Sequence, residues 1–68
     1  MHIGIVKWFN NVKGFGFITC DTVEGDIFAH FSEIKQDGYR SLKVGQKVQF
    51  ELVTNERGAS ATHISTIE

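Results

Sequence analysis

Aromatic side chains that recur at every second position are the groups of this chain whose type and spacing suggest a binding chemistry. Phe15 and Phe17 are separated by one glycine, and Phe28 and His30 by one alanine. Because side chains alternate between the two faces of an extended strand, each pair of rings shares one face. Two such strands side by side would form a flat aromatic surface. Single-stranded nucleic acid stacks its unpaired bases on surfaces of this kind, and lysines at the edge hold its phosphates.

The segment around the first pair of rings also matches a sequence motif. Residues 13–18 (KGFGFI) fit the RNA-recognition consensus K/R-G-F/Y-G/A-F-V-x-F/Y outright at five positions, and Ile18 replaces valine conservatively. Cys20 stands where the consensus has its last aromatic residue, which removes one ring. Glycine weakens a strand and packs nothing, so its presence twice in this segment suggests that another group comes close to the backbone.

The pattern of the whole chain predicts strands and no long helix. We expect strands at residues 3–10, 15–20, 27–31, 46–54 and 59–67. We expect residues 21–26 to form a polar connection and Ser32 to cap one helical turn at residues 32–35. Five strands without helices favour an all-β fold, a five-stranded antiparallel barrel of the oligonucleotide-binding (OB) type. An RNA-recognition-motif domain is disfavoured because it needs helices covering one face of its sheet.

Alternation divides the hydrophobic residues between the interior of this barrel and its outer face. The residues expected inside are Val6, Ile18, Ile27, Ala29, Ile34, Val48, Phe50, Ala61 and Ile64. Phe15, Phe17 and Phe28 alternate with these residues. Because both faces of a strand cannot be interior in so small a barrel, a stacking role is favoured over an ordinary core role for these three rings.

Other candidates are less well placed by the pattern alone. Alternation puts Trp8 with Val6 and opposite Lys7. A twist or a bulge of the strand would be needed to bring Trp8 and Lys7 onto one surface. His30 fits a structural histidine or a metal ligand, but its register with Phe28 favours base contact.

Five residues have two interpretations each. Phe31 and Tyr39 either cap the end of the barrel or contact bases. Lys7 and Lys13 are either solvated charges or phosphate contacts, and Arg57 either holds its turn or contacts the ligand.

Length and composition limit the possible functions. The 68 residues predict one domain spanning residues 1–68, without room for a large catalytic cleft. The net charge of -1 does not itself support nucleic-acid binding, for which a basic balance is usual. Lys7 and Lys13 are nevertheless the only charged residues before Asp21, so the first aromatic segment is locally positive. Stacking should therefore contribute more to affinity than charge.

Cysteine usage and the amino terminus bear on location. The single Cys20 excludes an internal disulfide, and no Cys/His spacing resembles a zinc site. The chain has neither a signal-peptide pattern nor an apolar run long enough to span a membrane. We expect a cytoplasmic protein that needs no cofactor or metal and does not bind membranes.

Several of these segments resemble the bacterial cold-shock proteins. The resemblance rests on residues 4–10 (GIVKWFN), 13–18, 26–32 (DIFAHFS) and Gly45-Gln46, and it covers nearly the whole chain. It implies a five-stranded antiparallel barrel that binds single-stranded RNA or DNA with a mild preference for pyrimidines. It also implies that the binding face comprises Lys7, Trp8, Lys13, Phe15, Phe17, Phe28, His30, Phe31, Tyr39 and Arg57.

Within that family the chain looks more like the D-type member than the cold-induced A-type. The segments that indicate this are Asn10-Asn11, residues 26–30 and residues 37–50. D-type proteins are associated with stationary phase and with inhibition of DNA replication, and they can dimerise. The resemblance therefore leaves open a monomer or a weak homodimer, and RNA or DNA as ligand.

We compare three classes of function. The first is a single-stranded nucleic-acid-binding protein that acts as an RNA chaperone or as a regulator of transcription or translation. The second is a protein-interaction module that uses the same exposed aromatic patch. The third, an enzyme using His30 with Asp26 or Cys20, is disfavoured because no nucleophile, base and orienting group occur together.

Overall fold

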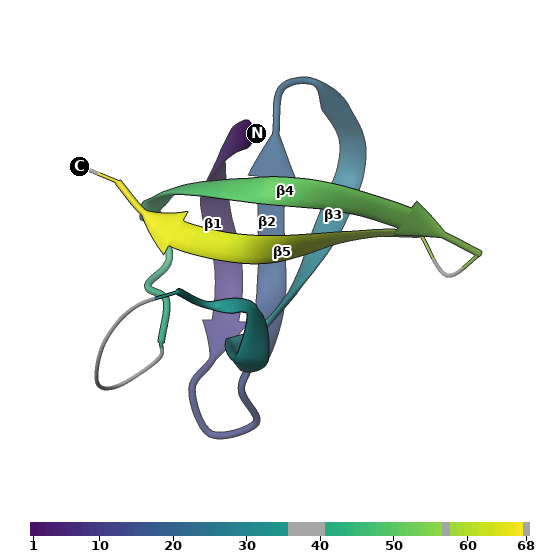
Figure 1. Cartoon of the computed structure of the whole chain (residues 1–68). Helices are drawn as coiled ribbons and strands as arrows, with labels where there is room; N and C mark the ends of the chain where they lie inside the picture. Colours follow the sequence, from purple (N-terminus) through teal and green to yellow (C-terminus); the bar gives the residue numbers. More distant parts are fainter. Residues whose placement is uncertain (36–40, 57, 68) are drawn as a thin grey trace.

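The computed structural model describes residues 1–35, 41–56 and 58–67, whose strands close into a five-stranded barrel (Figure 1). The elements are β1 (His2–Asn10), β2 (Phe15–Cys20), β3 (Val23–His30), the 3-10 turn η1 (Phe31–Glu33), β4 (Lys47–Asn55) and β5 (Gly58–Thr66). The strand order around the barrel is β1-β2-β3-β5-β4, and only β3 and β5 pair in parallel. The predicted all-β barrel is confirmed.

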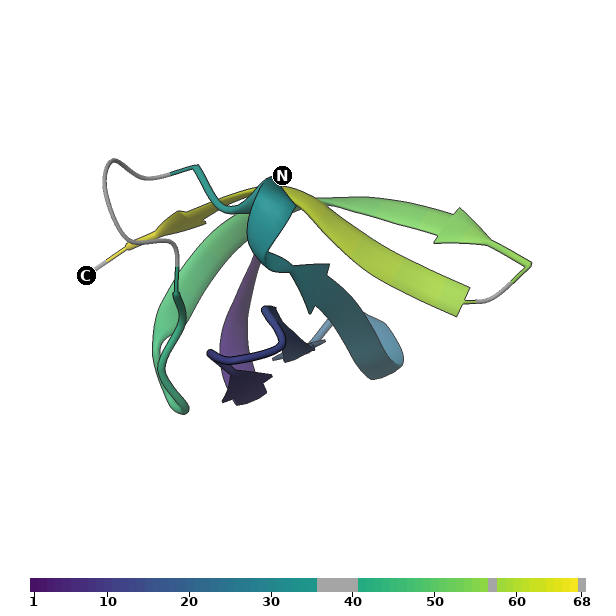
Figure 2. The same ribbon diagram turned by 90° about the horizontal axis from the view of Figure 1, so that it is seen from below.

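Two substructures make up the barrel. Strands β1, β2 and β3 form a meander, and the β4–β5 hairpin crosses over it (Figure 1). Seen from below, the far end of this hairpin projects away from the other strands (Figure 2). Strand β5 meets β3 only where Phe28 is opposite Ser60 and Ala29 is opposite Ala61. Beyond these pairs the hairpin leaves the meander, and the faces of β2 and β3 stay open beside it.

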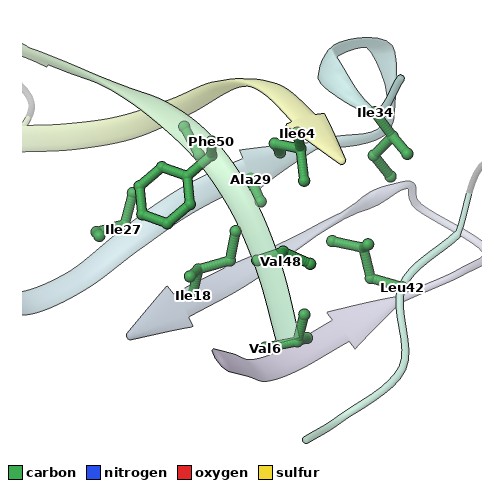
Figure 3. Close-up of a cluster of buried hydrophobic side chains, with 10 residues drawn as sticks. Val6, Ile18, Ile27, Ala29, Ile34, Leu42, Val48, Phe50 and Ile64 are labelled. Atoms are coloured by element: carbon green, nitrogen blue, oxygen red, sulfur yellow. The ribbon is translucent and has the colours of Figure 1, made fainter. Parts of the chain in front are cut away.

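The interior contains the side chains that alternation assigns to it (Figure 3). All nine residues expected inside are at most 2% exposed. Leu42 also belongs to the core at 1% exposure, although it lies in a stretch without recognisable periodicity. Burial of these apolar side chains is the main favourable term for so small a chain. Leu52, predicted on the same face as Val48 and Phe50, packs against the core while only partly buried.

Strand β3 begins earlier than the sequence predicts. The sequence predicts residues 23–26 as part of a polar connection, but they belong to β3, and Val23 pairs with Cys20. Backbone pairing continues there because the polar side chains of Glu24 and Asp26 point to solvent at no cost, while Val23 packs against the core. The connection between β2 and β3 is therefore only the turn at Asp21 and Thr22.

The end of β3 also differs from the prediction. The sequence predicts Phe31 as the last residue of the strand, but it is the first residue of η1. His30, and not Ser32, is the N-cap of this turn. The reason is that the Phe31 amide donates to the carbonyl of Gly14 at 2.7 Å, which turns the chain toward the β1–β2 loop.

Within the described ranges, no helix reaches the length and apolarity that crossing a membrane requires.

Candidate nucleic-acid interface

A continuous group of aromatic rings covers the outer face of the meander. We call it the aromatic platform; its members are Trp8, Phe15, Phe17, Phe28, His30 and Phe31. Neighbouring ring centroids are 4.7 to 6.4 Å apart, from Trp8 at one side to Phe31 at the other. Trp8 is 43% exposed, Phe28 39% and Phe31 42%, and the other three members are half-buried. These rings can receive the faces of bases without any rearrangement of the core.

The register of β2 and β3 builds the centre of the platform. Phe17 is directly opposite Phe28, and Phe15 is directly opposite His30. Side chains that are opposite each other on one face of two paired strands lie within contact distance. The outward-facing rings of the two strands therefore form one continuous surface. The centroid of Phe15 is 6.0 Å from that of Phe28, and the two rings are nearly parallel at 28°. The two aromatic segments therefore lie together as the sequence predicts.

A bulge in β1 adds Trp8 to the platform. Val6 is opposite Ile18, but the next partners are Trp8 and Phe17, so the register shifts at Lys7. An extra residue in one strand reverses the alternation beyond it. Trp8 consequently points outward although Val6 is buried, and its ring lies 6.2 Å from Phe17 and 5.7 Å from Phe15.

Gly16 is required where β2 passes the bulge. A Cβ atom at Gly16 would overlap the carbonyl oxygen of Trp8 and lie 2.6 Å from the Cα of Phe9. These are backbone atoms of the neighbouring strand, so they cannot move aside as a flexible side chain would. The close approach that the sequence suggests at Gly16 is that of β1 itself.

The β1–β2 loop holds Phe31 at the edge of the platform. The side-chain Oδ1 of Asn10 accepts from the amides of Val12 and Lys13, each at 2.9 Å. Gly14, with a φ of +79°, presents its carbonyl to the Phe31 amide, and a Cβ on it would lie 2.5 Å from the Phe31 ring. The left-handed backbone and the nearby ring both favour glycine at this position.

Charge at the platform is modest. Lys7 Nζ lies 3.2 Å from Asp26 Oδ1, and both side chains are largely exposed. Lys13 is exposed on the β1–β2 loop. One of the two lysines predicted to contact phosphate is therefore already paired with a carboxylate. Sequence reasoning missed this pair because its members are 19 residues apart and belong to β1 and β3.

A groove continues the platform toward the end of the β4–β5 hairpin. Its lining residues are Phe17, Asp26, Phe28, Asn55, Gly58, Ala59 and Ser60. Two platform rings form one side, and small residues at the start of β5 form the other. The parallel contact of Phe28 with Ser60 creates this groove, and no local pattern of the sequence indicates such a contact between distant strands.

Two of the predicted site residues, Tyr39 and Arg57, lie outside the described residues. The other eight lie on the meander, on the loop between β1 and β2, or on η1. Among the described residues, His, Cys, Asp and Glu side chains do not gather into a group that could hold a metal ion.

Comparison with known proteins decides the family. The sequence profile of the 'Cold-shock' DNA-binding domain matches residues 2–67. The chain belongs to the cold-shock domain family. As a member of this family it is a single-stranded nucleic-acid-binding protein, as the sequence predicts.

Relatives of the cold-shock family cover the chain almost completely. Cold shock-like protein CspD of Haemophilus influenzae is 64% identical over 98% of this chain and 93% of its own length. CspD of Escherichia coli K12 is 53% identical over all of this chain and 92% of its own. Cold shock protein CspA of Staphylococcus haemolyticus is 55% identical over 94% and 96% of the two chains.

A solved structure supports the fold. The chain titled "drosophila Unr CSD456" superimposes with a TM-score of 0.81, covering 98% of this cold-shock chain and 26% of the other. At 24% sequence identity this likeness concerns the barrel alone.

Proposed function

We propose that this cold-shock protein is an RNA chaperone that traps unpaired bases by stacking them on the aromatic platform. The observation that carries the proposal is the row of rings with contacts of 4.7 to 6.4 Å on the outside of a barrel whose core is complete without them. Lys7 and Lys13 at the edge would contact phosphates. Tyr39 and Arg57 are further proposed contacts from segments outside the described residues.

The expected affinity follows from stacking. Each stacked base contributes about 1–3 kcal/mol, so four or five bases give on the order of 5–12 kcal/mol before the cost of ordering the strand. Micromolar to nanomolar dissociation constants follow. Pyrimidine-rich stretches are the proposed preference. Because one chain carries the platform, we propose that a monomer suffices for binding.

A second candidate function concerns DNA. The 64% identity to a protein named CspD favours the D-type alternative, in which the same platform binds single-stranded DNA and slows replication. Stacking does not depend on the 2′-hydroxyl, so the platform serves either ligand. The two functions differ in which nucleic acid is bound in the cell, which cross-linking in growing and stationary cells would separate.

The chaperone proposal predicts that the protein opens weak hairpins without nucleotide hydrolysis. We expect stoichiometric opening of a dye-labelled RNA hairpin with a short A-U stem, because bound single strand is removed from the folding equilibrium. The measurement is dye fluorescence during titration without ATP. A stable G-C hairpin of the same loop serves as control and should stay closed. If the weak hairpin also stays closed at protein concentrations that saturate its isolated loop sequence, the chaperone proposal is wrong.

The pair between Lys7 and Asp26 predicts an unusual gain of binding. Asp26→Asn should strengthen binding of a heptathymidine strand about two- to fivefold, because an exposed ion pair is worth at most about 1 kcal/mol and the released ammonium becomes available to phosphate. The slope of log K against log salt should steepen by up to about 0.7, the value of one added contact on a single strand. Fluorescence titration at several salt concentrations measures both.

Glu24→Gln is the matched control for this prediction. Glu24 is an exposed carboxylate on the same strand, and its substitution changes the net charge equally. If Asp26→Asn and Glu24→Gln increase the affinity for heptathymidine equally, the increase is due to net charge. That result would contradict the claim that Asp26 competes with the ligand for Lys7.

A further inference from the structure

We infer that the backbone amide of Ser32 fixes one tautomer of His30 and thereby gives the aromatic platform a directional hydrogen-bond donor. The inference rests on the proposed binding function, and it deepens that function by assigning Ser32 as a positioning residue. Neither the alternation of the sequence nor membership of the cold-shock family assigns this role.

The evidence is the geometry of the turn after β3. The amide nitrogen of Ser32 lies 3.2 Å from His30 Nδ1, and the Ser32 hydroxyl oxygen lies 2.9 Å from the same atom. A backbone N–H can only donate, so Nδ1 must accept and cannot carry a proton. A neutral imidazole with an unprotonated Nδ1 carries its proton on Nε2. The Ser32 hydroxyl can donate to Nδ1 or accept from it, so the backbone amide is the contact that decides the tautomer.

The ring is held where this donor can meet a ligand. His30 caps η1 from an extended backbone with φ of -116° and ψ of 145°. Its ring centroid lies 4.7 Å from that of Phe31 and 6.4 Å from that of Phe28, so it is part of the platform. The cap holds Nδ1 against the chain, and Nε2 is the ring nitrogen further from the backbone. Among the described residues, no hydrogen bond uses Nε2.

A fixed N–H donor at a stacking surface selects an acceptor. On single-stranded nucleic acid this acceptor is a carbonyl oxygen or an unprotonated ring nitrogen of a base, or an oxygen of the sugar-phosphate backbone. An exocyclic amino group, itself a donor, cannot pair with it. The platform therefore combines sequence-tolerant stacking with one polar contact of fixed direction.

The first experiment determines the tautomer in the free protein. Long-range proton–nitrogen NMR spectra at a pH where histidine is neutral distinguish protonated from unprotonated ring nitrogens. We expect His30 to carry its proton on Nε2 in the wild type and also in Ser32→Ala, because alanine keeps the backbone amide that donates to Nδ1. Comparable amounts of both tautomers in the wild type, or a predominant Nδ1-protonated form in Ser32→Ala, would overturn the assignment. His63 in the same spectra is the internal reference.

The second experiment tests the donor in the complex. His30→Phe keeps an aromatic ring and removes the N–H, so heptathymidine should bind about three- to tenfold more weakly, the usual worth of one neutral hydrogen bond. The loss should shrink with methylphosphonate linkages if the acceptor is phosphate, because the uncharged linkage is a weaker acceptor, and it should persist in full if the acceptor lies on a base. Equal affinity of wild type and His30→Phe, both for heptathymidine with phosphate linkages and for heptathymidine with methylphosphonate linkages, would overturn the donor role. Wild-type binding in the same titration reports separately on the proposed function.

Discussion

Replacing Phe15, Phe17 and Phe28 together by alanine is expected to abolish measurable binding of heptathymidine while the barrel stays folded. Each ring contributes about 1–3 kcal/mol of stacking, so the combined loss is on the order of 3–9 kcal/mol, or a hundredfold to a millionfold in affinity. The core does not depend on these rings, because Ile18, Ile27 and the other interior side chains point to the opposite face. Calorimetric titration measures the affinity, and circular dichroism measures the fold.

The control variant must remove exposed apolar side chains that lie outside the aromatic platform. Ile3, Ile5 and Val44 are 56%, 41% and 69% exposed and belong to no part of the aromatic platform. Replacing these three by threonine keeps strand propensity at Ile3 and Ile5 of β1 and should leave affinity within about twofold. If the triple phenylalanine variant is unstable, the three single variants are compared instead. Unchanged affinity in a folded triple variant would contradict base stacking on the platform.

Gly16→Ala is expected to destabilise the barrel by at least about 3 kcal/mol, which is a large part of the stability of so small a domain. The added methyl group meets the carbonyl of Trp8 and the Cα of Phe9, so β1 and β2 must separate at these two residues, which follow the bulge. Urea denaturation followed by circular dichroism measures the free energy of unfolding. Binding should fall as well, because Trp8 and Phe17 lose their common position.

Gly25→Ala separates this clash from the general cost of losing a glycine. Gly25 has a φ of +87°, and a Cβ there would meet nothing within 4 Å. Its substitution should cost about 1–2 kcal/mol, from the strained backbone alone. If Gly16→Ala is no more destabilising than Gly25→Ala, the close approach of β1 to Gly16 does not constrain the fold as described.

Features governed by alternation could be predicted from the sequence. The buried positions of Ile18, Ile27 and Ala29 follow from period two, because a strand that buries one face must expose the other. That the strands of Phe17 and Phe28 lie side by side follows from their places next to each other in the sequence, whereas the exact opposition of the two rings is seen in the structure. The family motifs around these rings then identified the ligand class correctly.

Features that depend on distant contacts or on backbone geometry could not be predicted. Leu42 is buried although it lies in a stretch without hydrophobic periodicity, so its place in the core is seen only in the closed barrel. Ser60 lines the groove because β3 and β5 pair in parallel, and this pairing can be predicted only when the order of the strands around the barrel is known. His30 caps η1 because the Phe31 amide is already bonded across to Gly14, and side-chain propensities favour Ser32 instead. The sequence indicates the bulge at Lys7 only indirectly, because strict alternation places Trp8 on the same face as Val6.

The account depends most on the claim that unpaired bases stack on the aromatic platform, and Trp8 provides the direct measurement. Its indole is 43% exposed and contacts both Phe15 and Phe17, so a base on the platform must alter its emission. We predict strong quenching by heptathymidine, with a salt slope of only about -1.5 to -2 for two or three phosphate contacts. A duplex containing the same sequence should cause no change. Absence of quenching by the single strand, or equal binding of the duplex, would contradict the account.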